Sequence, residues 1–170
     1  MKRHIFLTGE IQIGKSTAIR RFLESSGIHA DGFLTRFDSR GEERKLYLCR
    51  YDTKLGESDT ELAVIMNGHS PELIIETFNI HGAAIIRTAG SSGLIIMDEL
   101  GVFEESAPQF KAAVFEKLDG GVPVLGVVKK KDSPFLDAVR VHPNVEVIEV
   151  TEDNRDAVPG LIAELIKGRL

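Results

Sequence analysis

The chain lacks several features that mark particular classes of protein. It has a single cysteine, Cys49, and no run of apolar residues long enough to cross a membrane. A lone cysteine cannot form a disulfide within the chain and fits a reducing compartment. The only apolar run near the N-terminus, residues 5–7, is too short for the core of a signal peptide. We therefore expect a cytoplasmic protein without a membrane partner.

Other absences concern partners and metals. Basic residues are not in excess, because the formal net charge is −5, and this balance argues against nucleic acid as a main partner. The histidines are scattered without the spacing of a metal-ligand set. No repeat or Pro/Ser-rich linker divides the sequence, so residues 1–170 are expected to form a single domain. The sequence does not identify a protein partner.

A phosphate-binding motif follows the first apolar run. Residues 9–16 read Gly-Glu-Ile-Gln-Ile-Gly-Lys-Ser and fit the P-loop pattern G-x-x-x-x-G-K-[ST]. The run at 5–7 predicts a buried strand before the loop, and apolar residues at helical spacing predict a helix after it that ends at 25–27. In that order, backbone N–H groups and the positive end of the helix dipole face a bound polyphosphate. The motif predicts a nucleoside di- or triphosphate as ligand.

Each residue of the motif has an expected task. Lys15 is predicted to contact the outer phosphates as a catalytic residue, and the Ser16 hydroxyl is predicted to bind Mg²⁺. Because most contacts come from the backbone, ATP, GTP and the pyrimidine nucleotides are not distinguished. The predicted nucleotide-binding residues of the loop are Gly9, Glu10, Ile11, Gln12, Ile13, Gly14, Lys15, Ser16 and Thr17.

Two adjacent carboxylates complete the candidate site. Asp98 and Glu99 end the apolar run 94–97, which reads as a strand buried on both faces. Asp98 is the expected second protein group at the Mg²⁺ held by Ser16, and Glu99 is expected to orient or deprotonate a water as a catalytic residue. Carboxylates also occur wherever a strand reaches solvent. Together with the P-loop upstream, however, the pair indicates a hydrolytic P-loop protein of the RecA-like division.

Alternating strand and helix patterns predict an α/β fold with a mostly parallel sheet and helices on both faces. Residues 32–37 and 45–51 alternate in strand fashion around a glycine-containing turn and predict a β-hairpin insertion. Residues 52–70 have no clear pattern, and 71–78 weakly favour strand and turn. The other expected elements are strands at 122–128 and 145–150 and helices at 82–89, at 107–118, from 133 and over 154–170.

Basic residues outside the P-loop leave alternatives open. The first lysine of Lys129-Lys130-Lys131 follows a predicted strand and is a candidate for contact with the terminal phosphate, although a solvated turn explains the run more simply. Arg36, Arg40 and Arg44 are candidates for a mobile lid, or they form the solvated face of the hairpin. Arg155 is a candidate for stacking on a base, and a helix cap explains its segment without that contact.

Several stretches together resemble one family, the small nucleoside-triphosphatases first described from thermophiles, with a human relative called cancer-related nucleoside-triphosphatase. The resemblance implies a RecA-like fold and slow, Mg²⁺-dependent hydrolysis of nucleoside triphosphates with loose base preference. It implies the roles given above to Lys15, Ser16, Asp98 and Glu99, and it favours Arg155 as a contact on the base side. Besides the P-loop, the matching stretches are Asp31-Gly32-Phe33-Leu34-Thr35, Met97-Asp98-Glu99-Leu100-Gly101, Ser133-Pro134-Phe135-Leu136-Asp137 and residues 145–156.

The sequence departs from this family at two places. The middle of the P-loop, residues 10–13, is Glu-Ile-Gln-Ile where the family is commonly richer in glycine and proline. Glu10 is expected to weaken polyphosphate binding unless its side chain points outward. After the Asp-Glu-x-Gly element, Val102 and Phe103 stand where the family often has lysine and methionine.

Three functions fit these motifs. The first is hydrolysis of nucleoside triphosphates to diphosphate and phosphate, with Glu99 directing the water. The second is a kinase that passes the terminal phosphate to a small molecule or nucleotide, which requires an acceptor pocket. The third is a nucleotide-dependent switch that needs a partner. Phosphate release without an acceptor, acceptor-dependent turnover and stimulation by a partner would distinguish them.

Overall fold

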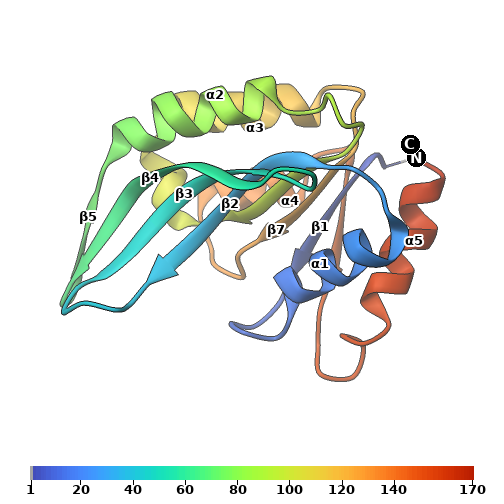
Figure 1. Ribbon diagram of the computed structural model, residues 1–170, viewed down its shortest axis with the longest axis horizontal. Coiled ribbons are helices and arrows are strands. Elements are labelled where there is room, and N and C mark those ends of the chain that lie inside the picture. Colours follow the sequence, from blue (N-terminus) through green and yellow to red (C-terminus); the bar gives the residue numbers. More distant parts are fainter. Residues whose placement is uncertain (1) are drawn as a thin grey trace.

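The strands pair into a single eight-stranded sheet, in a computed structural model that describes residues 2–170 (Figure 1). Their order across the sheet is β5-β4-β3-β2-β6-β7-β1-β8. The pairs β2–β6, β6–β7, β7–β1 and β1–β8 are parallel, whereas β2–β3, β3–β4 and β4–β5 are antiparallel. The strands are β1 (His4–Thr8), β2 (Asp31–Asp38), β3 (Arg44–Asp52), β4 (Gly56–Asn67), β5 (Ser70–Leu73), β6 (Ile95–Leu100), β7 (Val124–Val128) and β8 (Val145–Glu149).

Helices cover both faces of the sheet, which confirms the predicted fold class. In Figure 1, α1 and α5 lie together on one side, while α2 and α3 lie on the opposite side. Within residues 2–170, every helix is too short or too polar to span a bilayer. The helices are α1 (Lys15–Ser26), the π-helix η1 (Thr77–Gly82), α2 (Ala83–Thr88), the 3-10 helix η2 (Val102–Ser106), α3 (Pro108–Leu118), α4 (Pro134–Arg140) and α5 (Val158–Lys167).

Each face of the sheet buries its own apolar core, and β1 contributes to both. Ile5 and Leu7 pack with α1 and α5, whereas Phe6 packs on the opposite side with residues of α2 and α3. All three side chains are fully buried. Alternation of side chains along a strand sends neighbours to opposite faces, so a strand covered on both sides must be apolar throughout. This burial fixes the strand that carries the P-loop.

The predicted hairpin is confirmed, but it forms part of a longer antiparallel unit. β2 and β3 pair in register from Asp31–Asp52 to Asp38–Lys45. The segment 52–70, which has no clear pattern, contains the whole of β4 and the first residue of β5. The weak preference for strand and turn over 71–78 is wrong beyond β5, because residues 75–88 are helical. This helical segment forms because Phe78, Ile85 and Ile86 bury their side chains in the core of that face.

The terminal helix begins later than predicted. Residues 151–157 form turns, and α5 starts at Val158 with a proline in its first turn. The Asn154 side chain accepts a hydrogen bond from the Thr151 N–H at 2.8 Å and donates one to the Glu149 carbonyl at 2.8 Å. These bonds satisfy the backbone after β8 without a helix. The prediction of a helix over 154–170 is therefore wrong for its first four residues.

Candidate active site

The P-loop joins β1 to α1 at the carboxyl end of the parallel strands. Because α1 begins at Lys15, the N–H groups of its first turn have no partner within the helix and face the loop. The loop also runs closely against the end of β8. A Cβ on Gly9, whose φ is +143°, would lie 2.5 Å from the Val150 carbonyl oxygen. The turns of 151–157 thus begin beside the loop that is expected to hold the phosphates.

Lys15 is folded into the loop. Lys15 is only 9% exposed, and its ammonium donates hydrogen bonds to the carbonyl oxygens of Gly9 at 3.0 Å and Glu10 at 2.6 Å. Burial lowers the pKa of Lys15, and the nearby charges of Glu99 and Asp98 partly oppose that shift. The ammonium therefore lies inside the concave backbone of the loop, where a polyphosphate would be bound.

Ser16 and Asp98 meet at the base of the same loop. The Ser16 hydroxyl donates a hydrogen bond to the Asp98 carboxylate at 3.0 Å, across 82 residues of sequence. Burial raises the pKa of Asp98 to about 6, although the bond from Ser16 favours its charged form. One hydroxyl and one carboxylate oxygen are hard oxygen donors and lie side by side. Parallel pairing of β6 with β7, and of β7 with β1, brings them together.

Glu99 continues the site toward β7. Its carboxylate lies 3.7 Å from the Lys129 ammonium, and both side chains are partly exposed. Its backbone N–H donates to the Thr35 hydroxyl at 3.2 Å, and that hydroxyl donates to the Asp98 carbonyl at 3.4 Å. Thr35 of β2 thereby fixes the backbone of both acidic residues. The arrangement places a partly exposed carboxylate next to the Ser16–Asp98 pair.

Known proteins match the chain over nearly its whole length. A family model described as NTPase matches residues 4–163. The chain belongs to this NTPase family. The family predicted from the sequence motifs is thus confirmed.

Relatives in the NTPase family come from bacteria, archaea and mammals. Nucleoside-triphosphatase THEP1 of Natranaerobius thermophilus is 29% identical over 175 residues, covering 98% of both chains. Nucleoside-triphosphatase THEP1 of Thermococcus kodakarensis is 30% identical over 182 residues, covering 100% of this chain and 97% of the relative. The cancer-related nucleoside-triphosphatase homolog of Mus musculus is 29% identical over 193 residues, covering 99% of this chain and 100% of the relative.

Two solved structures confirm the fold. The crystal structure of THEP1 from the hyperthermophile Aquifex aeolicus matches with a TM-score of 0.76 at 24% identity, covering 96% of this chain and 99% of that one. The solution structure of a human cancer-related nucleoside triphosphatase matches with a TM-score of 0.73 at 23% identity, covering 99% of both.

The P-loop of this NTPase-family member carries an acidic residue whose charge is balanced outside the loop. The Glu10 carboxylate is 75% exposed and lies 3.0 Å from the Lys130 ammonium, which also lies 2.9 Å from the Glu149 carboxylate. Lys130 holds the pKa of Glu10 below its ordinary value. The Glu10 side chain therefore points outward, which is the condition under which it is not expected to weaken polyphosphate binding.

The hairpin arginines are paired within the antiparallel strands. In the part of the chain that the structure describes, none of the three has an ion pair or hydrogen bond to the P-loop. This geometry agrees with the solvated-face interpretation of the hairpin. The pairs are Arg36 with Glu57, Arg40 with Asp38 at 2.8 Å, and Arg44 with the Phe37 ring, whose centroid is 3.7 Å from the guanidinium carbon.

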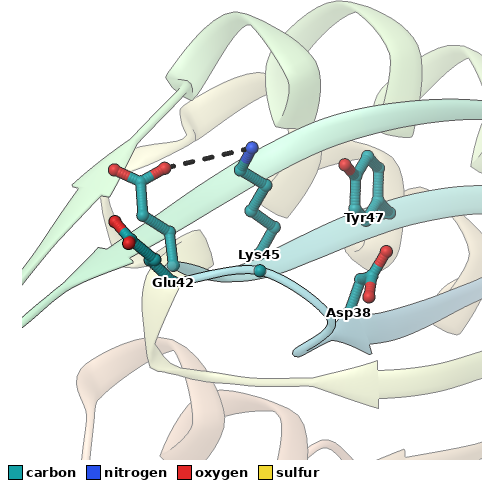
Figure 2. Close-up of a pocket in the computed structure, with 6 residues that line it drawn as sticks. Asp38, Glu42, Lys45 and Tyr47 are labelled. Carbon is teal, nitrogen blue, oxygen red and sulfur yellow. Dashed lines mark ion pairs between the residues drawn. The ribbon is translucent and has the colours of Figure 1, made fainter.

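Two cavities differ in their relation to the site. One of about 370 Å³ opens at the hairpin turn, where Figure 2 shows Asp38, Glu42, Lys45 and Tyr47 around it, and no P-loop residue lines it. The other, of about 290 Å³, lies between α1 and the sheet. Both members of the Ser16–Asp98 pair line this second cavity, so it borders the candidate metal site. Its remaining lining residues are Thr17, Ile19, Arg20, Leu23, Leu34, Tyr51, Glu57 and Ile96.

Three further residues lie at the candidate site, although the sequence carries a weaker signal for them than for the P-loop, or none. Thr35 fixes the acidic pair, and it lies inside the stretch 31–35 that signalled the family. Lys129 lies beside Glu99, which favours the phosphate alternative for this lysine over a solvated turn. Glu104, only 2% exposed, accepts a hydrogen bond from the Gly101 N–H at 3.0 Å and holds the chain just after the acidic pair. No sequence signal distinguishes this buried glutamate from a surface one.

Proposed function

We propose that this chain hydrolyses nucleoside 5′-triphosphates to diphosphate and phosphate, slowly and with loose base preference. The observation that carries the proposal is the 3.0 Å contact of Ser16 with Asp98 at the base of a P-loop, with Glu99 as the next residue. The names of its relatives, nucleoside-triphosphatases, support the same reaction. On this proposal residues 1–170 act as one P-loop domain. A cytoplasmic location stays a prediction from the sequence, based on the single cysteine and on the shortness of its apolar runs.

The chain's own residues divide the work of the reaction. Residues 9–17 bind the phosphates through the loop backbone, and the Lys15 ammonium moves from the carbonyl oxygens of Gly9 and Glu10 to the outer phosphates. Glu99 orients a water toward the terminal phosphorus and takes up its proton as the new P–O bond forms and the bond to the diphosphate breaks. Thr35 keeps that carboxylate in place through the backbone. Because the loop contacts the phosphates and not the base, all four common nucleoside triphosphates are accepted as substrates.

We propose Mg²⁺ as the cofactor, held by Ser16 and Asp98. The donor set fits this ion, since Mg²⁺ prefers oxygen ligands and typically combines one or two protein groups with phosphate oxygens and waters. Within residues 2–170 no cluster of three or more His, Cys, Asp or Glu side chains could hold a metal by itself, which agrees with a site completed by substrate. When bound, Mg²⁺ neutralises charge on the transferred phosphoryl group.

We propose a weaker, base-side role for Arg155. Support comes from its position in the chain: Val150, whose carbonyl oxygen lies against Gly9, precedes this exposed arginine by five residues. The Asn154 side chain and backbone hydrogen bonds hold the turns of 151–157, so the Arg155 side chain is not needed as a structural cap. An Arg155→Ala variant should bind Mg-ATP several-fold more weakly and leave inorganic triphosphate binding unchanged.

Phosphate release from ATP, GTP, CTP and UTP with Mg²⁺, by the wild-type protein and by Glu99→Gln, tests the proposal. We expect release without any acceptor, and a drop of about a hundredfold or more in Glu99→Gln with nucleotide affinity retained, the size of a general-base contribution. A variant as fast as the wild type would remove Glu99 from the mechanism. Binding without any release would reject hydrolysis as the activity.

One observation favours a kinase as a second candidate. The cavity of about 290 Å³ shares Ser16 and Asp98 with the metal site and is large enough for a small molecule. It is therefore a candidate for the acceptor pocket that a kinase requires. Labelled ATP incubated with a panel of nucleosides and nucleoside monophosphates tests this candidate. Transfer of label to an acceptor, with little free phosphate, would favour the kinase over the hydrolase.

A further inference from the structure

The first residue after β7 occupies a distinctive place in this fold. β7 lies between β1, which leads into the P-loop, and β6, which carries Asp98 and Glu99. All three strands are parallel, so their carboxyl ends meet at the same edge of the sheet. The residue at that position, Lys129, therefore emerges between the loop that binds phosphates and the carboxylate that faces the water.

The backbone of Lys129 is held on both sides. Its N–H donates to the Leu100 carbonyl at 2.9 Å, which ties it to the end of the strand that carries Glu99. Its carbonyl accepts a hydrogen bond from the guanidinium of Arg140 on α4, and the same guanidinium binds the Lys131 carbonyl at 2.7 Å. The turn after β7 is thus braced, and the side chain of Lys129 leaves it from a fixed point.

The ammonium of Lys129 faces the candidate site. It lies 3.7 Å from the Glu99 carboxylate, and its side chain is 25% exposed. By contrast, Lys130 is bound to Glu10 and Glu149 on the outer side of the loop.

We propose that Lys129 is a catalytic residue that binds the terminal phosphate of the nucleotide, leaving Glu99 when a triphosphate is bound. A terminal phosphoryl group in transfer spreads negative charge over three oxygens, and P-loop enzymes commonly bring a second cation to them besides the loop lysine. The hairpin arginines are held by partners in the antiparallel strands, whereas Lys129 is already in place. Its departure also frees the Glu99 carboxylate to accept a hydrogen bond from water. The inference rests on the proposed function, because it names a further group at the same site.

The test compares triphosphate with diphosphate binding, using the β,γ-imido analogue of ATP and ADP, each with Mg²⁺, by calorimetry. Lys129→Met should bind ADP within about threefold of the wild type, because ADP lacks the terminal phosphate. It should bind the analogue about tenfold or more weakly, the loss expected for one charge-assisted hydrogen bond. Its kcat for ATP should fall by roughly a hundredfold. Lys129→Arg should restore part of both. Lys131→Met, an exposed lysine of the same turn, is the matched control and should match the wild type.

Three outcomes would overturn the proposal: unchanged affinities and kcat, equal weakening of both ligands, or a fall in kcat alone. The second would make Lys129 a support of the P-loop, and the third would limit it to positioning Glu99. The binding comparison remains informative if the wild type releases no phosphate. In that case hydrolysis is rejected while the contact of Lys129 with the terminal phosphate is still measured.

Discussion

At the scale of single residues, Lys15 offers the most direct test of the P-loop assignment. Its ammonium lies within the P-loop on two carbonyl oxygens. Lys15→Ala should weaken binding of Mg-ATP by about a hundredfold or more, because the polyphosphate loses its direct charge partner in a mostly buried setting. Calorimetry measures this, with the urea midpoint of the variant as the control for folding. Undiminished affinity in a folded variant would defeat the P-loop assignment.

Glu104 gives the fold a dependence on pH. Burial raises its pKa to about 7 from 4.5, and hydrogen bonds from its own N–H and from Gly101 partly oppose that shift. The folded state therefore holds this proton more tightly than the unfolded chain, and stability falls as pH rises from about 4.5 through 7. The loss is at most roughly 3 kcal/mol, since one pKa unit corresponds to about 1.4 kcal/mol.

Glu104→Gln tests this linkage because the amide oxygen can still accept the Gly101 hydrogen bond. Urea unfolding between pH 5 and pH 8 should show a smaller decline of stability in the variant than in the wild type. All other titrating groups are shared by the two proteins, so the difference isolates this carboxyl group. If the free energy of unfolding depends on pH in the same way in both proteins, Glu104 does not titrate between pH 5 and pH 8.

At the scale of elements, the pairing of β2 with β6 depends on one glycine. A Cβ on Gly32, whose φ is +151°, would lie 2.0 Å from the carbonyl oxygen of Ile96 in the neighbouring strand. Gly32→Ala should therefore lower the free energy of unfolding by about 3 kcal/mol or more, because backbone atoms cannot yield as a flexible side chain can. Urea unfolding measures the loss.

Gly160→Ala serves as the opposite case. Gly160 lies inside α5, and a methyl group added to its Cα would have no atom within 4 Å, so alanine should stabilise the helix by about 0.5–1 kcal/mol. A Gly32→Ala protein as stable as the wild type would show that β2 and β6 can move apart without loss.

The elements also differ in how well the sequence alone predicts them, and the same is true of the residues of the candidate site. The P-loop, its strand and its helix are local signals, so motif and periodicity identify them. β4 was not predicted because its first residues, 56–61, are polar and mostly exposed, and it forms by pairing its backbone with β3. Thr35, Lys129 and Glu104 join the site from three separate elements. Their meeting depends on the order of strands in the sheet, which no local pattern encodes.

At the scale of the whole molecule, ligand binding should be visible as stability. A ligand present at a hundred times its Kd stabilises the native state by about 2.7 kcal/mol. For a chain of this length that corresponds to a rise in Tm of roughly 5–10 °C. Mg-ATP should give such a shift, and a chelator should remove most of it, because Ser16 and Asp98 are proposed to act through the ion. An equal shift with chelator present would contradict their assignment to Mg²⁺.

The position of β1 inside the sheet has a consequence for the growing polypeptide. β1 pairs only with β7 and β8, so its partners come from residues 124–149. The strand that leads into the P-loop is synthesised more than 100 residues before these partners, so Ile5, Phe6 and Leu7 stay uncovered on that edge until the partners appear. A nascent chain that stops before residue 124 therefore leaves β1 without either partner strand, and the exposed apolar strand favours chaperone binding and aggregation. We therefore expect nucleotide binding only after β7 and β8 have been synthesised.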